Sequence, residues 1–272
     1  MMRIVDRRVA WVTGASRGMG ADTARCLATA GFDLAITARD RAALDAVAAD
    51  VGARGGACLA RPSDLTDRAS MDAFAGAALD RFGRCDVLCN IGIYKGASLR
   101  YLVDETTPDE VLRHYEADVL APLLLCQRAL PWMRRHGGTI LNMGSSSIFL
   151  DPPGTAHENG WSFAYAAAKA GLDQLARILN VELDTARVRT FNVEPGFVAY
   201  GAAFEDKLRR YPGVAVSPPE SIGPALVWLV ESPEADRLLG KRVNLPGLTH
   251  RHGLLPGWGG PGTPWPPPTA QR

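Results

Sequence analysis

Short apolar runs alternate along the chain with longer segments in which apolar residues recur every three or four positions. The short runs predict seven β-strands, and the longer segments predict the helices that connect them. The predicted strands are RVAWVTG, DLAITA, ACLAR, DVLCNIG, GTILNMGS, VRTFNVEPG and KRVNLPG. Because strands that are joined by helices pair in parallel, we predict an α/β fold with a doubly wound, seven-stranded parallel sheet in a single domain.

Two proline-containing segments predict helix starts. Thr107, Pro108 and Glu110 form a capping box with proline at the first helical position. The segment SPPE at 217–220 predicts a second start, and Asp40 is expected to cap the helix that begins in RAALDAVAAD.

The final segment, 251–272, differs in composition from residues 1–250, which we assign to the α/β domain. The last twenty residues contain six prolines and five glycines, which excludes a continuous helix or a central strand. Two alternatives remain for this segment: a frayed tail, or an arm that lies on the body or on a neighbouring subunit.

Composition and charge indicate an ordinary globular protein. The 272 residues are 47% hydrophobic and 22% charged, and 30 basic side chains against 29 acidic ones predict no nucleic-acid partner. No signal peptide or membrane span is predicted, so we expect a cytoplasmic protein. Five cysteines without paired metal-ligand spacing are expected to be reduced thiols, and are Cys26, Cys58, Cys85, Cys89 and Cys126.

The first predicted strand runs directly into TGASRGMG, and a helical pattern follows. Gly14, Gly18 and Gly20 would let the backbone approach a pyrophosphate at the helix N-terminus, so this context predicts a dinucleotide site. An acidic residue at the end of the second strand would favour NAD, but TARDR places Ala38 and Arg39 there. With Arg17 in the glycine loop, the two arginines favour the 2′-phosphate of NADP(H) over NAD(H), unless both are simply solvated.

The segment WSFAYAAAK places Tyr165 and Lys169 four residues apart, on one face of a predicted helix. A nearby ammonium lowers the pKa of a phenol and suits it to proton exchange with an alcohol or carbonyl oxygen. Taken alone, the spacing is common on amphipathic helices. Ser145, in NMGSSS after the fifth strand, is expected at the same sheet edge.

Several motifs together resemble the classical short-chain dehydrogenase/reductase family. They are TGASRGMG, Asp64 of SDLTD, Asn90 and Gly92 of CNIG, Ser145 of NMGSSS, YAAAK and EPGFV, in the family's order and spacing over about residues 5–247. The resemblance implies a Rossmann-type dinucleotide-binding domain that transfers a hydride at the nicotinamide C4.

The resemblance also implies residue roles. Tyr165 would be the acid/base, Lys169 would lower its pKa and hold the nicotinamide ribose, and Ser145 would orient the substrate oxygen. The cofactor-binding residues that it implies are Gly14, Ser16, Arg17, Gly18, Met19, Gly20, Arg39, Asp64, Leu65, Asn90, Gly92, Tyr165, Lys169, Pro195, Gly196 and Val198. We expect a ketone or aldehyde interconverted with an alcohol, and a homodimer or homotetramer.

The sequence departs from the family pattern at a catalytic position. Asp118 stands where relatives usually carry an asparagine, and its charge would oppose the effect of Lys169 on Tyr165. We expect either a protonated Asp118 or an activity optimum at higher pH. Tyr200 stands where many relatives have threonine, which puts one contact to the nicotinamide in doubt.

An enlarged loop after Ser145 and the segment after the sixth strand predict a cleft for a hydrophobic small molecule. The residues are Phe149, Pro152, Pro153, Trp161, Phe163, Phe197, Tyr200, Phe204 and Tyr211. Some of these rings could instead pack the loop onto the body. His157 and Glu158 could touch a polar part of the substrate, and no metal is expected at His250 and His252 because a third ligand is missing.

Two other functions remain open. The first is a catalytically idle NADP-binding sensor or scaffold, which Asp118 and Tyr200 favour and the Ser145, Tyr165 and Lys169 set disfavours. The second is an epimerase or dehydratase, which generally needs a larger substrate domain than this chain provides.

Overall fold

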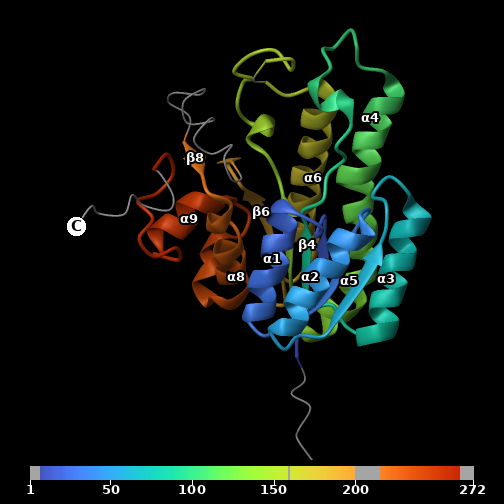
Figure 1. Ribbon diagram of the computed structural model, residues 1–272, viewed down its shortest axis with the longest axis vertical. Coiled ribbons are helices and arrows are strands. Elements are labelled where there is room, and N and C mark those ends of the chain that lie inside the picture. Colours follow the sequence, from blue (N-terminus) through green and yellow to red (C-terminus); the bar gives the residue numbers. More distant parts are fainter. Residues whose placement is uncertain (1–6, 159, 200–214, 264–272) are drawn as a thin grey trace, which may run out of the picture.

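Seven parallel strands form the central sheet of the computed structural model, whose described residues are 7–158, 160–199 and 215–263 (Figure 1). The sheet order is β3-β2-β1-β4-β5-β6-β9, so the strand order reverses between β1 and β4. The strands are β1 (Val9–Thr13), β2 (Asp33–Ala38), β3 (Cys58–Pro62), β4 (Val87–Asn90), β5 (Gly138–Met143), β6 (Val188–Glu194) and β9 (Arg242–Asn244). Every predicted strand is present, which confirms the Rossmann-type sheet.

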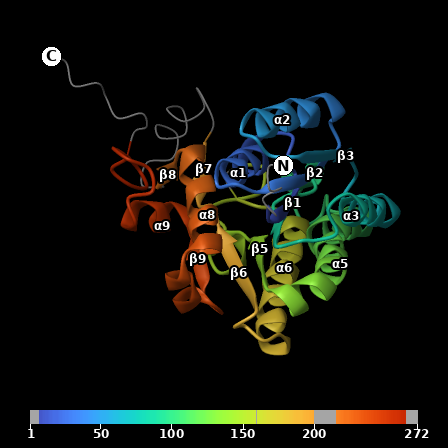
Figure 2. The ribbon, with the colours of Figure 1, turned by 90° about the horizontal axis from the view of Figure 1, so that it is seen from below.

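Helices cover both faces of the sheet. Figure 2 shows α1, α2 and α8 along one face and α3, α5 and α6 along the other. The helices are α1 (Gly18–Thr29), α2 (Arg41–Ala53), α3 (Arg68–Phe82), α4 (Pro108–Tyr115), α5 (Ala121–His136), α6 (Phe163–Glu182), α8 (Gly223–Glu231) and α9 (Leu245–Arg251). The described chain contains no helix that is both long and apolar enough to cross a membrane.

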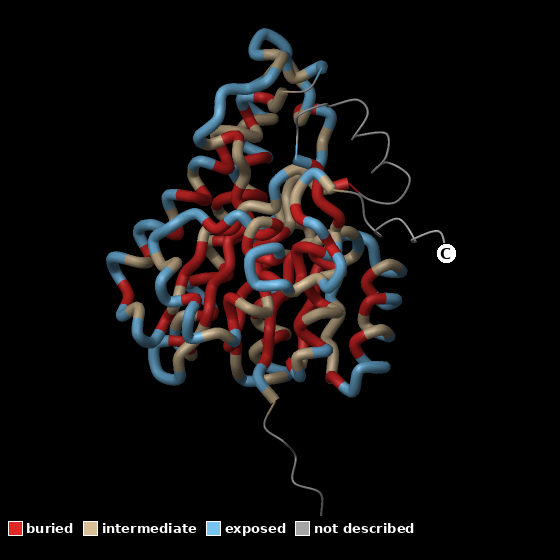
Figure 3. Tube along the Cα trace, turned by 90° about the vertical axis from the view of Figure 1, so that its left-hand side faces the viewer, coloured by how far each residue is buried: buried red, intermediate tan, exposed pale blue. Residues whose placement is uncertain are grey.

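The two helical layers enclose separate hydrophobic cores. Ala10 and Val12 of β1 pack into the core on the α1, α2 and α8 side, while Val9 and Trp11 belong to the core on the other side. Successive side chains of a strand point to opposite faces, so a strand covered on both sides must be apolar at nearly every position. The buried residues therefore follow the strands through the centre of the molecule (Figure 3).

Both predicted helix caps are confirmed. The Thr107 side chain accepts a hydrogen bond from the Glu110 N–H at 3.3 Å, and Asp40 accepts one from the Ala43 N–H at 3.1 Å. The predicted proline-led start at 217–220 is present as the 3₁₀ turn Pro219–Ser221, which leads into α8 at Gly223. Ser217 lies just before it, in the short strand β8 (Val216–Ser217), which pairs with β7 (Phe197–Val198).

The chain after α9 lies against the body as far as residue 263. Trp258 is only 6% exposed, and the Gly262 N–H donates to the Val216 carbonyl at 2.8 Å. Its second tryptophan, Trp265, lies outside the described residues. All five cysteines lie in the described ranges and are free thiols, with Cys85, Cys89 and Cys126 buried.

Truncating a buried leucine should lower the free energy of unfolding much more than truncating an exposed one. Leu88, in the central strand β4, has no exposed surface, so Leu88→Ala is expected to lower the free energy of unfolding by about 2–5 kcal/mol. Leu150 is 55% exposed, so Leu150→Ala should change that free energy by less than about 0.5 kcal/mol. Urea unfolding measures both, and equal losses would contradict this account of the core.

Candidate active site

The loops after β1 and β4 meet where the strand order reverses, and ligands of open α/β sheets bind at such a point. The Thr13 hydroxyl oxygen accepts the N–H groups of Ile91 and Gly92, each at 3.0 Å, and so ties the two loops together. Gly14 has φ +68°, and a Cβ there would lie 2.7 Å from the Gly92 Cα. Only glycine fits this contact without strain.

The glycine loop opens the N-terminus of α1. A Cβ on Gly20 would lie 2.3 Å from the Gly14 carbonyl oxygen, so the first turn of the helix lies directly on the loop. Arg17 occupies the N-cap position with extended backbone, and within the described residues no side chain caps α1 and no acidic residue lies in its first turn. Backbone N–H groups there are left for an anion, which fits a dinucleotide pyrophosphate.

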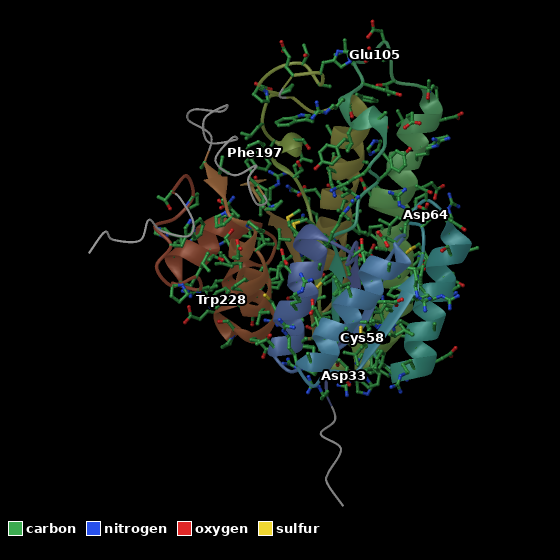
Figure 4. All side chains as sticks on the ribbon, in the orientation of Figure 1. Asp33, Cys58, Asp64, Glu105, Phe197 and Trp228 are labelled. Carbon is green, nitrogen blue, oxygen red and sulfur yellow. The ribbon has the colours of Figure 1, made fainter. Side chains whose placement is uncertain are left out.

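Other residues that are predicted to bind the cofactor also lie at the carboxyl edge of the sheet, near the glycine loop. Arg17 and Arg39 are exposed. The charge of Arg17 adds to burial in lowering the pKa of Lys95, so these two cations are close to each other. Asp64, labelled in Figure 4 near the start of α3, accepts hydrogen bonds from both the N–H and the hydroxyl of Thr66 at 2.9 Å.

Other members of the predicted set also border these loops. A Cβ on Gly92 would meet Leu65 Cδ1 at 2.6 Å, so Leu65 covers that glycine. Asn90, at the end of β4, donates from its amide to Asn142 Oδ1 at 2.8 Å. Ser16 and Met19 are half-buried in the glycine loop and the first turn of α1.

The predicted chemical residues converge from β5 and α6. Ser145 follows β5 and caps the 3₁₀ turn Ser146–Ile148 by accepting the Ser147 N–H at 3.2 Å. Its side chain acts to lower the pKa of Tyr165, which lies in the first turn of α6, a helix whose start is capped by Ser162. Serine and tyrosine hydroxyls in contact can hold one substrate oxygen between them.

Lys169 lies one turn after Tyr165 and is 1% exposed. Its ammonium donates to the Met143 carbonyl oxygen at 2.9 Å and lies 5.9 Å from the centre of the Tyr165 ring. Burial lowers the pKa of Lys169, and the charge of Asp118 acts in the opposite direction. The structure therefore brings Ser145, Tyr165 and Lys169 together, as predicted.

The pKa of Tyr165 differs from the lowering expected from the resemblance. Burial raises it to about 12, the hydrogen bond with Ser145 works against that rise, and the charge of Asp118 adds to it. The residue as a whole is half-buried. At neutral pH the phenol is therefore protonated in the cofactor-free chain.

Comparison with known proteins agrees with this geometry. The family model described as short chain dehydrogenase matches residues 8–210. The chain belongs to the short-chain dehydrogenase family.

Named relatives of this short-chain dehydrogenase act on different substrates. It is 30% identical to a 3-oxoacyl-[acyl-carrier-protein] reductase from Synechocystis sp., over 90% of this chain and 98% of the relative. It is 34% identical to a trans-4-hydroxycyclohexanecarboxylate dehydrogenase from Sinomonas cyclohexanicum, over 73% and 76% of the two chains. A crystal structure of a metagenomic short-chain oxidoreductase in complex with NADP matches with a TM-score of 0.70 and 31% identity, covering 87% of this chain and 96% of that one.

Asp118, the departure from the family pattern, lies in the π-helical segment Glu116–Leu120 between α4 and α5 and has no exposed surface. Its Oδ1 accepts the Tyr94 N–H at 3.1 Å. Its charge raises the pKa of the Tyr165 phenol, the direction expected for a carboxylate near the tyrosine.

The far rim of the site comes from β6. Pro195 and Gly196 follow this strand, with Gly196 at φ +64°, and Val198 then belongs to β7. Phe197, labelled in Figure 4, lies at the same upper edge. The expected substrate-facing residues Tyr200, Phe204 and Tyr211 lie outside the described residues.

The enlarged loop of this short-chain dehydrogenase rises above the sheet. His157 Nε2 lies 2.7 Å from Glu105 Oε2, a hydrogen bond that joins this loop to the segment before α4; Glu105 is labelled near the top of Figure 4. Phe149 packs against the Arg242 guanidinium, 4.6 Å from its ring centre, and Phe163 is 56% exposed. The contact that the structure gives His157 is therefore to Glu105 of the protein itself.

Three functional features were missed by sequence reasoning. They are the Met143 carbonyl that receives Lys169, the Arg242 contact to Phe149, and the buried His114 in the last turn of α4. A histidine four residues before Asp118 is a helical neighbour of that carboxyl, so the spacing could have pointed to it. In the part of the chain that the structure describes, no cluster of potential ligands could hold a metal ion, and His250 contacts Trp258 instead.

Because the loops after β1 and β4 approach so closely, adding one methyl group at Gly14 should lower the stability of the protein. Gly14→Ala should destabilise the short-chain dehydrogenase by roughly 1–3 kcal/mol, because it combines a left-handed backbone with a backbone clash. Gly52→Ala is the matched control: it lies in α2, no described atom is within 4 Å of its added Cβ, and helix propensity should stabilise it by about 0.5–1 kcal/mol. Urea unfolding that finds both changes neutral would contradict the loop contact.

Proposed function

We propose that this short-chain dehydrogenase is an NADP(H)-preferring enzyme that interconverts a ketone or aldehyde and the corresponding alcohol on a hydrophobic small molecule. The observation that carries the proposal is the placement of Ser145 after β5 and of Tyr165 in the first turn of α6, with the buried Lys169 one helical turn away and held on the Met143 carbonyl at 2.9 Å. These groups lie at the carboxyl edge of the sheet, the same edge that carries the glycine loop.

The residues at this edge fit a nicotinamide dinucleotide. A cradle of Gly14, Gly20 and Gly92 leaves no room for side chains, and the open first turn of α1 faces it. When bound, such a cofactor supplies or accepts a hydride. Lys169, whose ammonium is held on the Met143 carbonyl, is the residue that would contact the nicotinamide ribose.

Tyr165 acts as the acid in the reduction direction. Its pKa of about 12 keeps the hydroxyl protonated at neutral pH, ready to donate to the carbonyl oxygen that becomes an alcohol. Ser145 holds that oxygen by a second hydrogen bond. Oxidation of an alcohol requires the phenolate instead, so it is favoured by alkaline pH and by any group that stabilises the negative oxygen.

Substrate preference follows from the rings above the edge. Phe149 and Trp161 lie in the loop after Ser145, Phe163 is the first residue of α6, and Phe197 lies in β7 after β6. Apolar rings around a few placed hydroxyls favour a hydrophobic carbonyl compound or alcohol.

The cofactor preference rests on Arg17 and Arg39. Both arginines are exposed, and Asp40, which follows Arg39, is occupied as the cap of α2. The metagenomic relative of known structure carries NADP. Charge-assisted hydrogen bonds from two arginines would stabilise a 2′-phosphate.

The proposed role of Tyr165 as proton donor can be tested by removing its hydroxyl. Tyr165→Phe should reduce NADPH-dependent turnover of hydrophobic ketones by at least about 100-fold, because the proton donor is lost. Binding of NADPH should persist. Tyr115→Phe is the control, since Tyr115 lies in α4 and is 42% exposed. Absorbance of NADPH during turnover and its fluorescence on binding are the measurements.

The same experiment separates the two candidate functions. Turnover that survives in Tyr165→Phe would contradict the role of the tyrosine. Tight binding of NADPH without turnover of any ketone, diketone or aldehyde would support a catalytically idle sensor instead. The raised pKa of Tyr165 and the buried charge of Asp118 are the observations that keep this second function open.

The second prediction concerns the cofactor. Arg17→Ala and Arg39→Ala should each raise the KM for NADPH by about tenfold or more, the cost of a hydrogen bond to a charged group, and should leave the KM for NADH little changed. Arg41→Ala is the control, because Arg41 is exposed and pairs with Asp45 at 3.0 Å. Equal changes for both cofactors would contradict recognition of the 2′-phosphate.

A further inference from the structure

A buried histidine lies directly behind the proposed reaction centre. His114 lies in the last turn of α4, and Asp118 follows one turn later in the π-helical segment Glu116–Leu120. Neither side chain has any exposed surface, and His114 Nδ1 lies 3.7 Å from Asp118 Oδ2. The two groups face each other inside the protein.

Each group has one satisfied and one unsatisfied polar atom. Asp118 Oδ1 accepts the Tyr94 N–H at 3.1 Å, and His114 Nε2 lies 3.2 Å from the Ser98 hydroxyl oxygen. Among the described residues, His114 Nδ1 and Asp118 Oδ2 have no hydrogen-bond partner. Buried polar atoms rarely remain unpaired, and an N–H opposite a carboxylate oxygen is a complementary pair.

Ser98 decides which nitrogen of the histidine carries the proton. A hydroxyl can donate to Nε2, which leaves the proton of a neutral imidazole on Nδ1. That proton then points at Asp118 Oδ2. A movement of a few tenths of an ångström turns the 3.7 Å contact into a hydrogen bond.

The pair also touches the catalytic tyrosine. The His114 ring lies edge to face with the Tyr165 ring, with centroids 6.3 Å apart, and with the Tyr94 ring at 5.0 Å. Asp118 acts on both catalytic charges, since it raises the pKa of Tyr165 and opposes the fall in that of Lys169. A donor to Asp118 therefore changes the field at the reaction centre.

The other titratable groups around the pair come from three elements. Glu110, one turn before His114, is engaged by Arg113 at 3.1 Å. The titratable and charged groups facing the pair from its own helix, from the segment after β4 and from α6 are Glu110, Tyr94, Tyr165 and Lys169.

We propose that His114 is a positioning residue of the reaction centre, which holds Asp118 through an Nδ1–H···Oδ2 hydrogen bond and weakens the negative field that reaches Tyr165. A carboxylate can occupy this buried position because the imidazole N–H donates a hydrogen bond that stabilises its negative charge. The kinetic consequence rests on the function proposed above, whereas the hydrogen bond itself does not.

The first test reads the hydrogen bond without turnover. In the full chain, labelled with nitrogen-15 at its five histidines, one imidazole should carry a slowly exchanging Nδ1 proton between about pH 6 and 8. Its contacts to the rings of Tyr94 and Tyr165 assign it to His114 in the wild-type protein. Asp118→Asn should abolish the slow exchange. A proton on Nε2 instead, or a signal that Asp118→Asn leaves unchanged, would overturn the proposal.

The second test is a double-mutant cycle on the pH profile of alcohol oxidation with NADP⁺. Asp118→Asn should move the rise in rate to lower pH by about one unit, because the charge that opposes the phenolate is lost. His114→Gln should move it to higher pH by about half a unit, because the carboxylate loses its donor. In the Asp118→Asn background, His114→Gln should cause no further shift.

A merely structural role for His114 gives a different result. It predicts the same loss in both backgrounds with no change in the pH profile, and that outcome, or a shift to lower pH, would overturn the proposal. His136→Gln is the control, because His136 is exposed and stacks on Trp132. If no variant turns over any substrate, the proposed function fails, and the nuclear magnetic resonance result alone decides the role of His114.

Discussion

The parallel direction of all seven strands is the constraint on which the site depends. Because each strand is followed by a helix on one of two faces, the carboxyl ends of β1, β4, β5 and β6 share one edge of the sheet. The glycine loop, the Asn90 corner, Ser145 and the Pro195–Gly196 turn each follow one of these strands. Residues far apart in the chain therefore meet at one edge, where the loops after β1 and β4 are joined through the Thr13 hydroxyl.

The second constraint is electrostatic and lies within this edge. A buried ammonium, a buried carboxyl and a desolvated phenol occupy neighbouring positions on α6 and the helix before β5. Burial raises the pKa of Tyr165 and lowers that of Lys169, so desolvation opposes the charged form of both groups. Such an arrangement keeps the phenol protonated at neutral pH, which is the state that the proposed proton donor requires.

The fold and much of the site could be predicted from the sequence because each signal was local. Strand periodicity, the caps at Thr107 and Asp40, and the spacing of Tyr165 and Lys169 all depend on neighbours in the chain. What could not be predicted depends on tertiary contact. The pairing of Ser217 with Val198 in a short second sheet has no local signal, and neither has the burial that raises the pKa of Tyr165. His114 has meaning only because Ser98 and Asp118 flank its two nitrogens.

The central claim is that a hydride moves to a carbonyl carbon while Tyr165 supplies the proton to its oxygen. The most direct measurement is mass spectrometry of products after incubation with NADPH that carries deuterium at the transferred position of C4 and a pool of hydrophobic ketones. The account predicts an alcohol with deuterium on the carbinol carbon and a proton from solvent on its oxygen. Cofactor that is bound but keeps its deuterium, with no labelled alcohol formed, would contradict it.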